Sequence, residues 1–101
     1  MALDLYAGGS REAVKAQDEF LFQLAAEDAR RYPRLSAIWT GFYDDPSQTA
    51  EQAGAVVHEL IDLLAANGGM SNGALASVAL RLMSFFSAAY RQGVEVKAVS
   101  D

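Results

Sequence analysis

His58 is the only histidine in the 101-residue chain and the first residue to consider for chemistry. In the helical pattern around it, Glu51, His58 and Asp62 fall opposite the apolar side, and His58 and Asp62 are neighbours at a spacing of four. A histidine oriented by a carboxylate serves as a general base or a metal ligand. A zinc site normally takes three or more protein ligands, and the sequence offers no second histidine and no cysteine. The default interpretation of this trio is therefore a solvated helix surface.

Two glycine-rich segments, residues 7–10 and 68–73, each precede a predicted helix, whose N-terminus attracts anions. Neither contains the lysine of a phosphate-binding loop or the G-x-G-x-x-G pattern, so both are interpreted as turns and helix caps. The chain also lacks a G-x-S-x-G or H-E-x-x-H motif. We therefore expect a binding protein rather than an enzyme, without metal or cofactor.

The net charge of −5 is unevenly distributed along the chain. No lysine or arginine lies between residues 35 and 80, and the remainder of the chain is electrically balanced. Such an asymmetry argues against nucleic-acid binding and favours a protein partner with a basic surface. The acids of this central stretch are Asp44, Asp45, Glu51, Glu59 and Asp62.

The elements that must position these acids are predicted to be mainly helical, in one domain covering residues 1–101. Ser10 is a good N-cap, Pro33 favours a helix start, and residues 49–52 fit a capping box. Glycines at 68 and 93 favour helix ends. The predicted helices are residues 11–31, 33–42, 48–66 and 73–91.

Residues 73–91 are apolar on nearly all sides, which is typical of a central helix. Residues 2–6 and 94–99 alternate between apolar and polar, as strands do. Two isolated strands at opposite ends of a helical chain are expected to pair with each other. The predicted fold is a four-helix bundle-like domain with the last helix central and a two-stranded ribbon formed by the termini.

The cellular setting follows from three features of the composition. The chain has no cysteine, which suits a reducing compartment. Its first residues include Asp4 and no basic segment, unlike a secretion signal. We find no continuous apolar run of the length that spans a bilayer. We therefore expect a cytoplasmic protein that does not bind membranes.

In size, acidity and helical content, the chain resembles the small immunity proteins that bacteria make against their own toxins. This resemblance implies inhibition by occlusion, in which acids steer the encounter with a basic toxin surface and exposed aromatic residues anchor it. The predicted partner-binding residues are Tyr43, Asp44, Asp45, Glu51, His58, Glu59 and Asp62.

Two alternatives remain open from the sequence. The abundant apolar residues on the helices favour a homodimer or a larger homo-oligomeric scaffold. His58 with nearby carboxylates favours a small metal-binding protein or a carboxylate-based enzyme.

Overall fold

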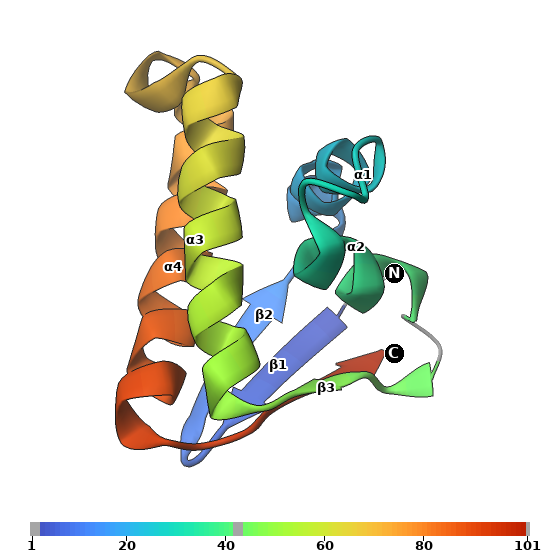
Figure 1. The fold of residues 1–101 in the computed structure, drawn as a ribbon, viewed down its shortest axis with the longest axis vertical. Coiled ribbons are helices and arrows are strands. Elements are labelled where there is room, and N and C mark those ends of the chain that lie inside the picture. Colours follow the sequence, from blue (N-terminus) through green and yellow to red (C-terminus); the bar gives the residue numbers. More distant parts are fainter. Residues whose placement is uncertain (1–2, 42–43, 101) are drawn as a thin grey trace.

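Four strands form one antiparallel sheet in the order β2-β1-β4-β3 (Figure 1). The computed structural model describes residues 3–41 and 44–100. β1 (Leu3–Ala7) pairs with β4 (Val96–Ser100), as predicted, and this pair lies in the middle of the sheet. β2 (Ser10–Val14) and β3 (Ser47–Gln48) extend the sheet on either side.

The prediction of a two-stranded ribbon is wrong, because residues 10–14 form β2 instead of the start of a helix. They fold back on β1 through a two-residue turn, which places Ala7 opposite Ser10 and Leu3 opposite Val14. Gly8, the first residue of the turn, has a φ of 57°, a left-handed conformation that glycine adopts without strain. In this strand the Val14 side chain is buried in the core.

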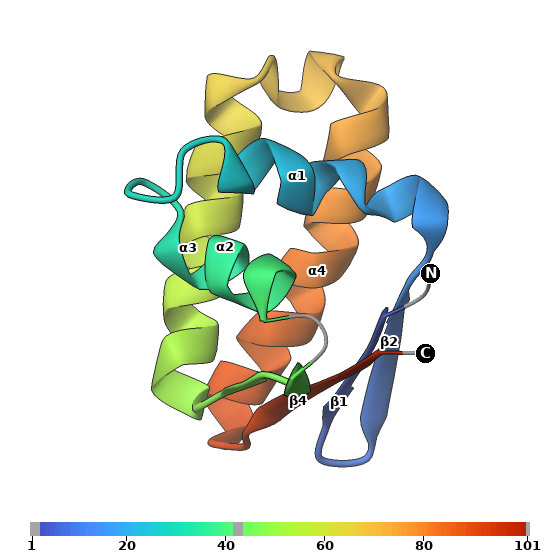
Figure 2. The ribbon, with the colours of Figure 1, turned by 90° about the vertical axis from the view of Figure 1, so that its right-hand side faces the viewer.

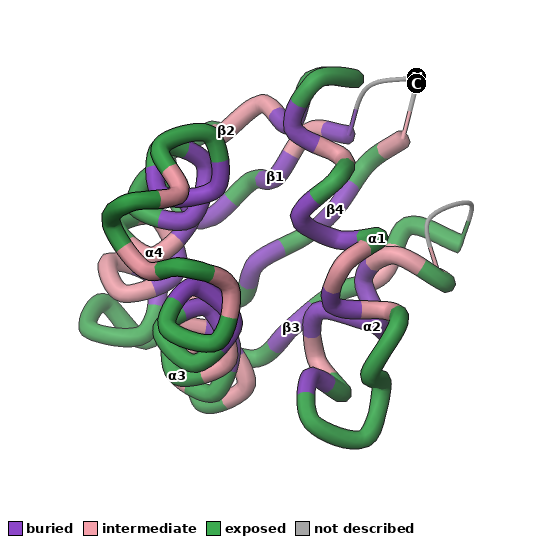
Figure 3. Tube along the Cα trace, turned by 90° about the horizontal axis from the view of Figure 1, so that it is seen from above, coloured by how far each residue is buried: buried purple, intermediate pink, exposed green. Residues whose placement is uncertain are grey.

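The helices lie on one face of the sheet (Figures 1 and 3). The predicted helix 11–31 shrinks to α1, whereas the other three predicted helices are confirmed with small shifts at their ends. In Figure 2, α3 and α4 run side by side, and α1 and α2 cross in front of them. The helical elements are η1 (Ala16–Asp18), α1 (Phe20–Ala26), α2 (Pro33–Thr40), α3 (Ala50–Ala66), η3 (Gly69–Ser71) and α4 (Gly73–Gln92).

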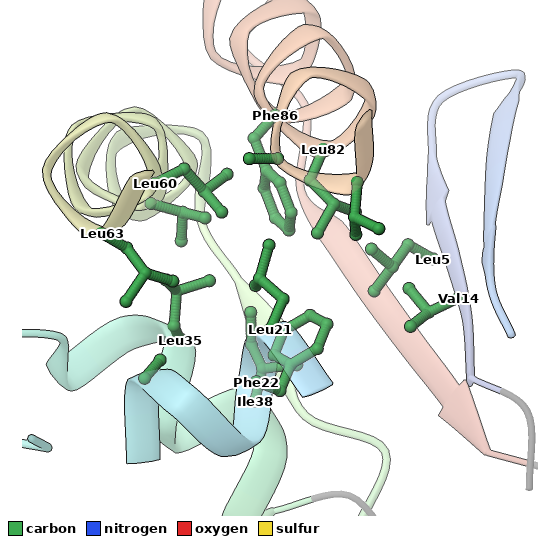
Figure 4. Close-up of a cluster of buried hydrophobic side chains, with 14 of the residues drawn as sticks. Leu5, Val14, Leu21, Phe22, Leu35, Ile38, Leu60, Leu63, Leu82 and Phe86 are labelled. Atoms are coloured by element: carbon green, nitrogen blue, oxygen red, sulfur yellow. The ribbon is translucent and has the colours of Figure 1, made fainter. Parts of the chain in front are cut away.

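A single hydrophobic core joins the sheet to the helices (Figure 4). On the sheet, alternate residues such as Leu3 and Leu5 point inward and are buried, while Tyr6 on the opposite face is exposed. Phe22 from α1 and Phe86 from α4 are fully buried among them. The fold is therefore a two-layer α+β structure and not a four-helix bundle.

The last helix is an outer helix and not the central one predicted. α4 packs along α3 and buries one side, but Leu80 is 47% exposed and Tyr90 54% exposed on its other sides. By length and composition α4 would be apolar enough to cross a membrane, with a mean hydropathy of 1.3. Core helices of soluble proteins can be equally long and apolar, and 44% of the apolar stretch of α4 is buried.

Candidate functional site

α3 carries most of the predicted partner-binding residues, and local sequence fixes where it begins. The Thr49 hydroxyl accepts a hydrogen bond from the Gln52 N–H at 3.1 Å, and the Gln52 side chain accepts one from the Thr49 N–H at 2.9 Å. This reciprocal pair is the predicted capping box. The helix buries Val56 and Leu60 against the core, which leaves Glu51 and His58 exposed on its outer side.

Glu59 is not a free surface acid, because its carboxylate caps a neighbouring helix. It accepts hydrogen bonds from the backbone N–H of Arg34, at 3.1 Å to each oxygen, and from that of Leu35 at 3.0 Å. These are unpaired donors of the first turn of α2, whose own N-cap residue, Tyr32, supplies no side-chain bond. The negative charge also lies at the positive end of the α2 dipole. Glu59 therefore holds α2 against α3.

Asp62 is likewise engaged within the chain, by Arg31 from the segment before α2. Two parallel hydrogen bonds of 2.9 and 3.0 Å join the guanidinium to the carboxylate. The hydrogen bond from Arg31 lowers the pKa of Asp62 below its ordinary value of 3.8. Arg31 also lies over the Tyr32 ring, 5.5 Å from its centroid, and burial raises the pKa of that phenol. Asp62 is thus neutralised locally and contributes little net charge to the surface.

The remaining predicted acids do not join the α3 surface. Asp44 and Asp45 are exposed in the segment before β3, and Asp45 has a left-handed φ of 45°. In Figure 1 this segment and the start of α3 lie at the two ends of β3. Tyr43 lies outside the described residues. Asp44 and Asp45 therefore lie apart from the acids of α3, of which Glu59 and Asp62 are engaged within the chain.

Glu51 and His58 do come together, in a groove between α3 and α4. The groove has a volume of about 510 Å³. Within the described part of the chain, the Glu51 carboxylate makes no ion pair. A smaller hollow of about 440 Å³ lies on the other side of His58, next to Ile61 and Asp62. The groove is lined by Glu51, Gly54, Ala55, Val57, His58, Ser87 and Tyr90.

The most distinctive contact in this groove joins Tyr90 to Gly54. A Cβ atom added at Gly54 would lie only 2.7 Å from Cδ1 of the Tyr90 ring and 3.0 Å from Cε1. Since real Cβ atoms do not approach so closely, the ring occupies space that only glycine leaves open. The ring lies on Gly54, and the residue is 54% exposed. Exposed tyrosines are enriched among the anchor residues of protein–protein contacts.

Tyr90, Gly54 and Ser87 were not identified from the sequence as site residues. One local signal was available, because a glycine inside a helical pattern costs stability and usually has a packing reason. It did not identify the partner, since Tyr90 is 36 positions away in sequence. Only the antiparallel packing of α3 on α4 brings the two residues together.

A second groove, of about 540 Å³, runs between the β1–β2 hairpin and α4. Its charged groups are already paired. Arg81 donates a hydrogen bond of 2.8 Å to the buried carboxylate of Asp18 and lies 3.9 Å from Glu12. Asp18 also accepts a hydrogen bond from the Lys15 N–H at 3.2 Å. These contacts tie α4 to the segment after β2, which is a structural role.

Metal binding by His58 would require further ligand side chains close to it. In the described ranges 3–41 and 44–100, no group of three histidine, cysteine, aspartate or glutamate side chains is placed to hold a metal ion. His58 shares its surroundings with Glu51 on one side and with Glu59 and Asp62 on the other, and the last two already bind backbone or arginine groups.

Comparison with known proteins adds no relationship to this picture. No family model, no curated protein and no solved structure matches the chain.

Proposed function

We propose that this protein is a protein-binding module that contacts its partner through the outer surface of α3 and α4. The antiparallel helices α3 and α4 form a helical hairpin, distinct from the β1–β2 hairpin. We call its outer surface the hairpin face and define it by Glu51, His58 and Ile61 on α3 and Ser87 and Tyr90 on α4. The observation that carries the proposal is the exposed Tyr90 ring packed on Gly54, beside a Glu51 carboxylate that makes no ion pair with any described residue. A tyrosine offers a large contact area with only two rotatable side-chain bonds, so a partner that covers it orders little conformational freedom.

The proposed partner presents a basic surface. The chain has a net charge of −5, and Glu51 is the acid of the hairpin face that no described residue neutralises. Complementary charge raises the rate of encounter and suppresses wrong partners. Tyr90 and the half-exposed Ile61 supply the apolar contact. A bacterial toxin with a basic active surface, inhibited in the cytoplasm by an immunity-type protein, fits this chemistry.

The test is binding between the purified protein and the product of the adjacent gene, measured by calorimetry. Tyr90→Ala is expected to weaken binding by about tenfold or more, as loss of a central aromatic anchor does. Glu51→Arg is expected to weaken binding, and to weaken it more at low salt than at high salt, because the effect is electrostatic. Charge reversal at Glu59 is avoided, since that residue caps α2.

Matched controls lie elsewhere on the molecule. Tyr6→Ala removes a 41% exposed tyrosine from the outer face of the sheet, and Glu27→Arg reverses an exposed acid at the end of α1. Both should bind as the wild type does. A neighbouring product that does not bind excludes the immunity-type role with that partner, and binding insensitive to both hairpin-face variants excludes this surface.

A second candidate function is self-association through the same side of the molecule. Leu80, Ser87 and Arg91 share one side of α4 at helical spacing, and Leu80 is 47% exposed. Arg91 makes no ion pair with any described residue, so Glu51 of one copy and Arg91 of another are complementary. Light scattering at micromolar concentrations tests this function, and a clean monomer rejects it.

A further inference from the structure

We infer that the groove between α3 and α4 is a receptor for one cationic side chain, with arginine preferred over lysine. The carboxylate of Glu51 and the ring of Tyr90 form its two recognition groups. This inference rests on the proposed function, because it names the chemical group of the partner that the hairpin face takes. The ligand class is an alkylguanidinium or alkylammonium group displayed on a protein surface.

The first step of the argument is the position of the two recognition groups. Glu51 and Gly54 are three residues apart on α3, so they are neighbours on the helix surface. The Tyr90 ring lies on Gly54, with Cγ only 3.2 Å and Cδ1 2.7 Å from a Cβ built there. The carboxylate and the ring therefore border the same hollow, as the groove lining shows.

The second step is the space available between them. Gly54 and Ala55 on α3 and Ser87 on α4 are small residues at the wall of the groove. The groove has a volume of about 510 Å³, which is ample for one long side chain. The groove is open to solvent, so it is accessible to a side chain of a partner whose backbone remains outside.

The third step is the chemistry of the recognition groups. An aromatic ring attracts cations through its negative face, and arginine can also stack its flat guanidinium on the ring. A carboxylate accepts two parallel hydrogen bonds from a guanidinium but offers lysine only a point contact. Glu51 is available for this contact because it has no ion pair within the described residues. An acid and an aromatic side by side therefore select an arginine.

The experiment is a titration followed by amide chemical shifts in NMR, with N-acetyl-arginine methylamide as the probe. Saturable shifts are expected at Gly54, Ala55 and Ser87, with a dissociation constant in the millimolar range. The neutral isostere N-acetyl-citrulline methylamide should bind about fivefold or more weakly, because it lacks the charge. The lysine probe should fall between the two.

Variants separate the two recognition groups. Tyr90→Leu and Glu51→Gln should each weaken the arginine probe several-fold, whereas Tyr90→Phe, which keeps the ring, should bind as the wild type does. Tyr6→Leu and Glu27→Gln are the matched controls and should change nothing. The NMR spectrum of each variant reports directly whether it is folded.

The inference is overturned if the shifts do not saturate, if citrulline binds as well as arginine, or if Tyr90→Leu binds the probe unchanged. The titration needs no natural partner, so its outcome is independent of whether a partner is found. If the groove binds the arginine probe but the protein does not bind the proposed partner, only the proposed function is refuted. A partner that binds the hairpin face while the arginine probe does not bind refutes only this inference.

Discussion

Substitution of Gly54 by alanine tests the packing on which the site depends. Gly54 lies inside α3, where glycine is less favourable than alanine by about 1 kcal/mol. The new methyl group would stand 2.7 Å from Cδ1, 3.0 Å from Cε1 and 3.2 Å from Cγ of Tyr90. All three atoms belong to the rigid ring, so the whole side chain must rotate away.

In the wild-type background, the gain in helix propensity from Gly54→Ala opposes the cost of displacing the Tyr90 ring. The gain in helix propensity is about 1 kcal/mol, and pushing a side chain off its rotamer costs roughly 0.5–1.5 kcal/mol. The net change in the free energy of unfolding should therefore be within about 0.5 kcal/mol of zero. With Tyr90 first replaced by alanine, the cost disappears and the full gain of about 1 kcal/mol remains. That gain corresponds to a rise in Tm of about 4–8 °C for a domain of this size.

The assay is urea unfolding followed by circular dichroism on the wild type, the two single variants and the double variant. The coupling free energy of this cycle should be about 0.5–1.5 kcal/mol, in the range for side chains in contact. Gly73→Ala is the matched control, because nothing lies within 4 Å of a Cβ at Gly73, and it should not couple to Tyr90. Equal stabilisation by Gly54→Ala in both backgrounds would refute the packing of the ring on α3.

Three further predictions concern the residues around the site. Glu59→Gln should lower the free energy of unfolding by about 1–2 kcal/mol, because the capping charge at α2 is lost, and unchanged stability in urea would contradict that role. Phe86→Ala, at a fully buried position, should cost about 3–5 kcal/mol, and an unmoved Tm would show that the ring is not part of the core. In Arg31→Gln, the pKa of Asp62 measured by NMR should rise toward 3.8. Since folding lowers this pKa, the stability contributed by the ion pair is present above pH 3.8 and is lost as the pH falls through the pKa of the folded state. If the pKa of Asp62 is the same in Arg31→Gln as in the wild type, the ion pair does not form.

Most helix boundaries were predictable because their signals are local. Pro33 begins α2, the Thr49–Gln52 capping box begins α3, and the Asn72 side chain caps α4 by accepting from the Leu75 N–H. Gly93 ends α4 with a φ of 69°. Each signal involves residues only a few positions apart, and the free energy of capping comes mainly from these local contacts.

The candidate site was predictable only in part. Helical periodicity placed Glu51 and His58 on the outer side of α3, and both do line one groove. The same periodicity placed Asp62 on that side, and Glu59 was predicted to bind the partner as well, but the approach of α2 and its preceding segment engages both in contacts within the chain. The position of Tyr90 depends on how α4 packs against α3, which helical spacing within either segment does not specify.

The sequence by itself determined three of the four helices, the pairing of the terminal strands and the excess of negative charge. The tertiary structure decided that residues 10–14 form a strand, because Ser10 and Glu12 suit a helix start as well as they suit β2. Pairing with β1 and burial of Val14 are contacts between segments, and their free energy outweighs the local preference. Contacts between segments also decide the roles of the acids. Glu51 remains a surface charge, whereas Glu59 becomes a helix cap because α2 packs beside it.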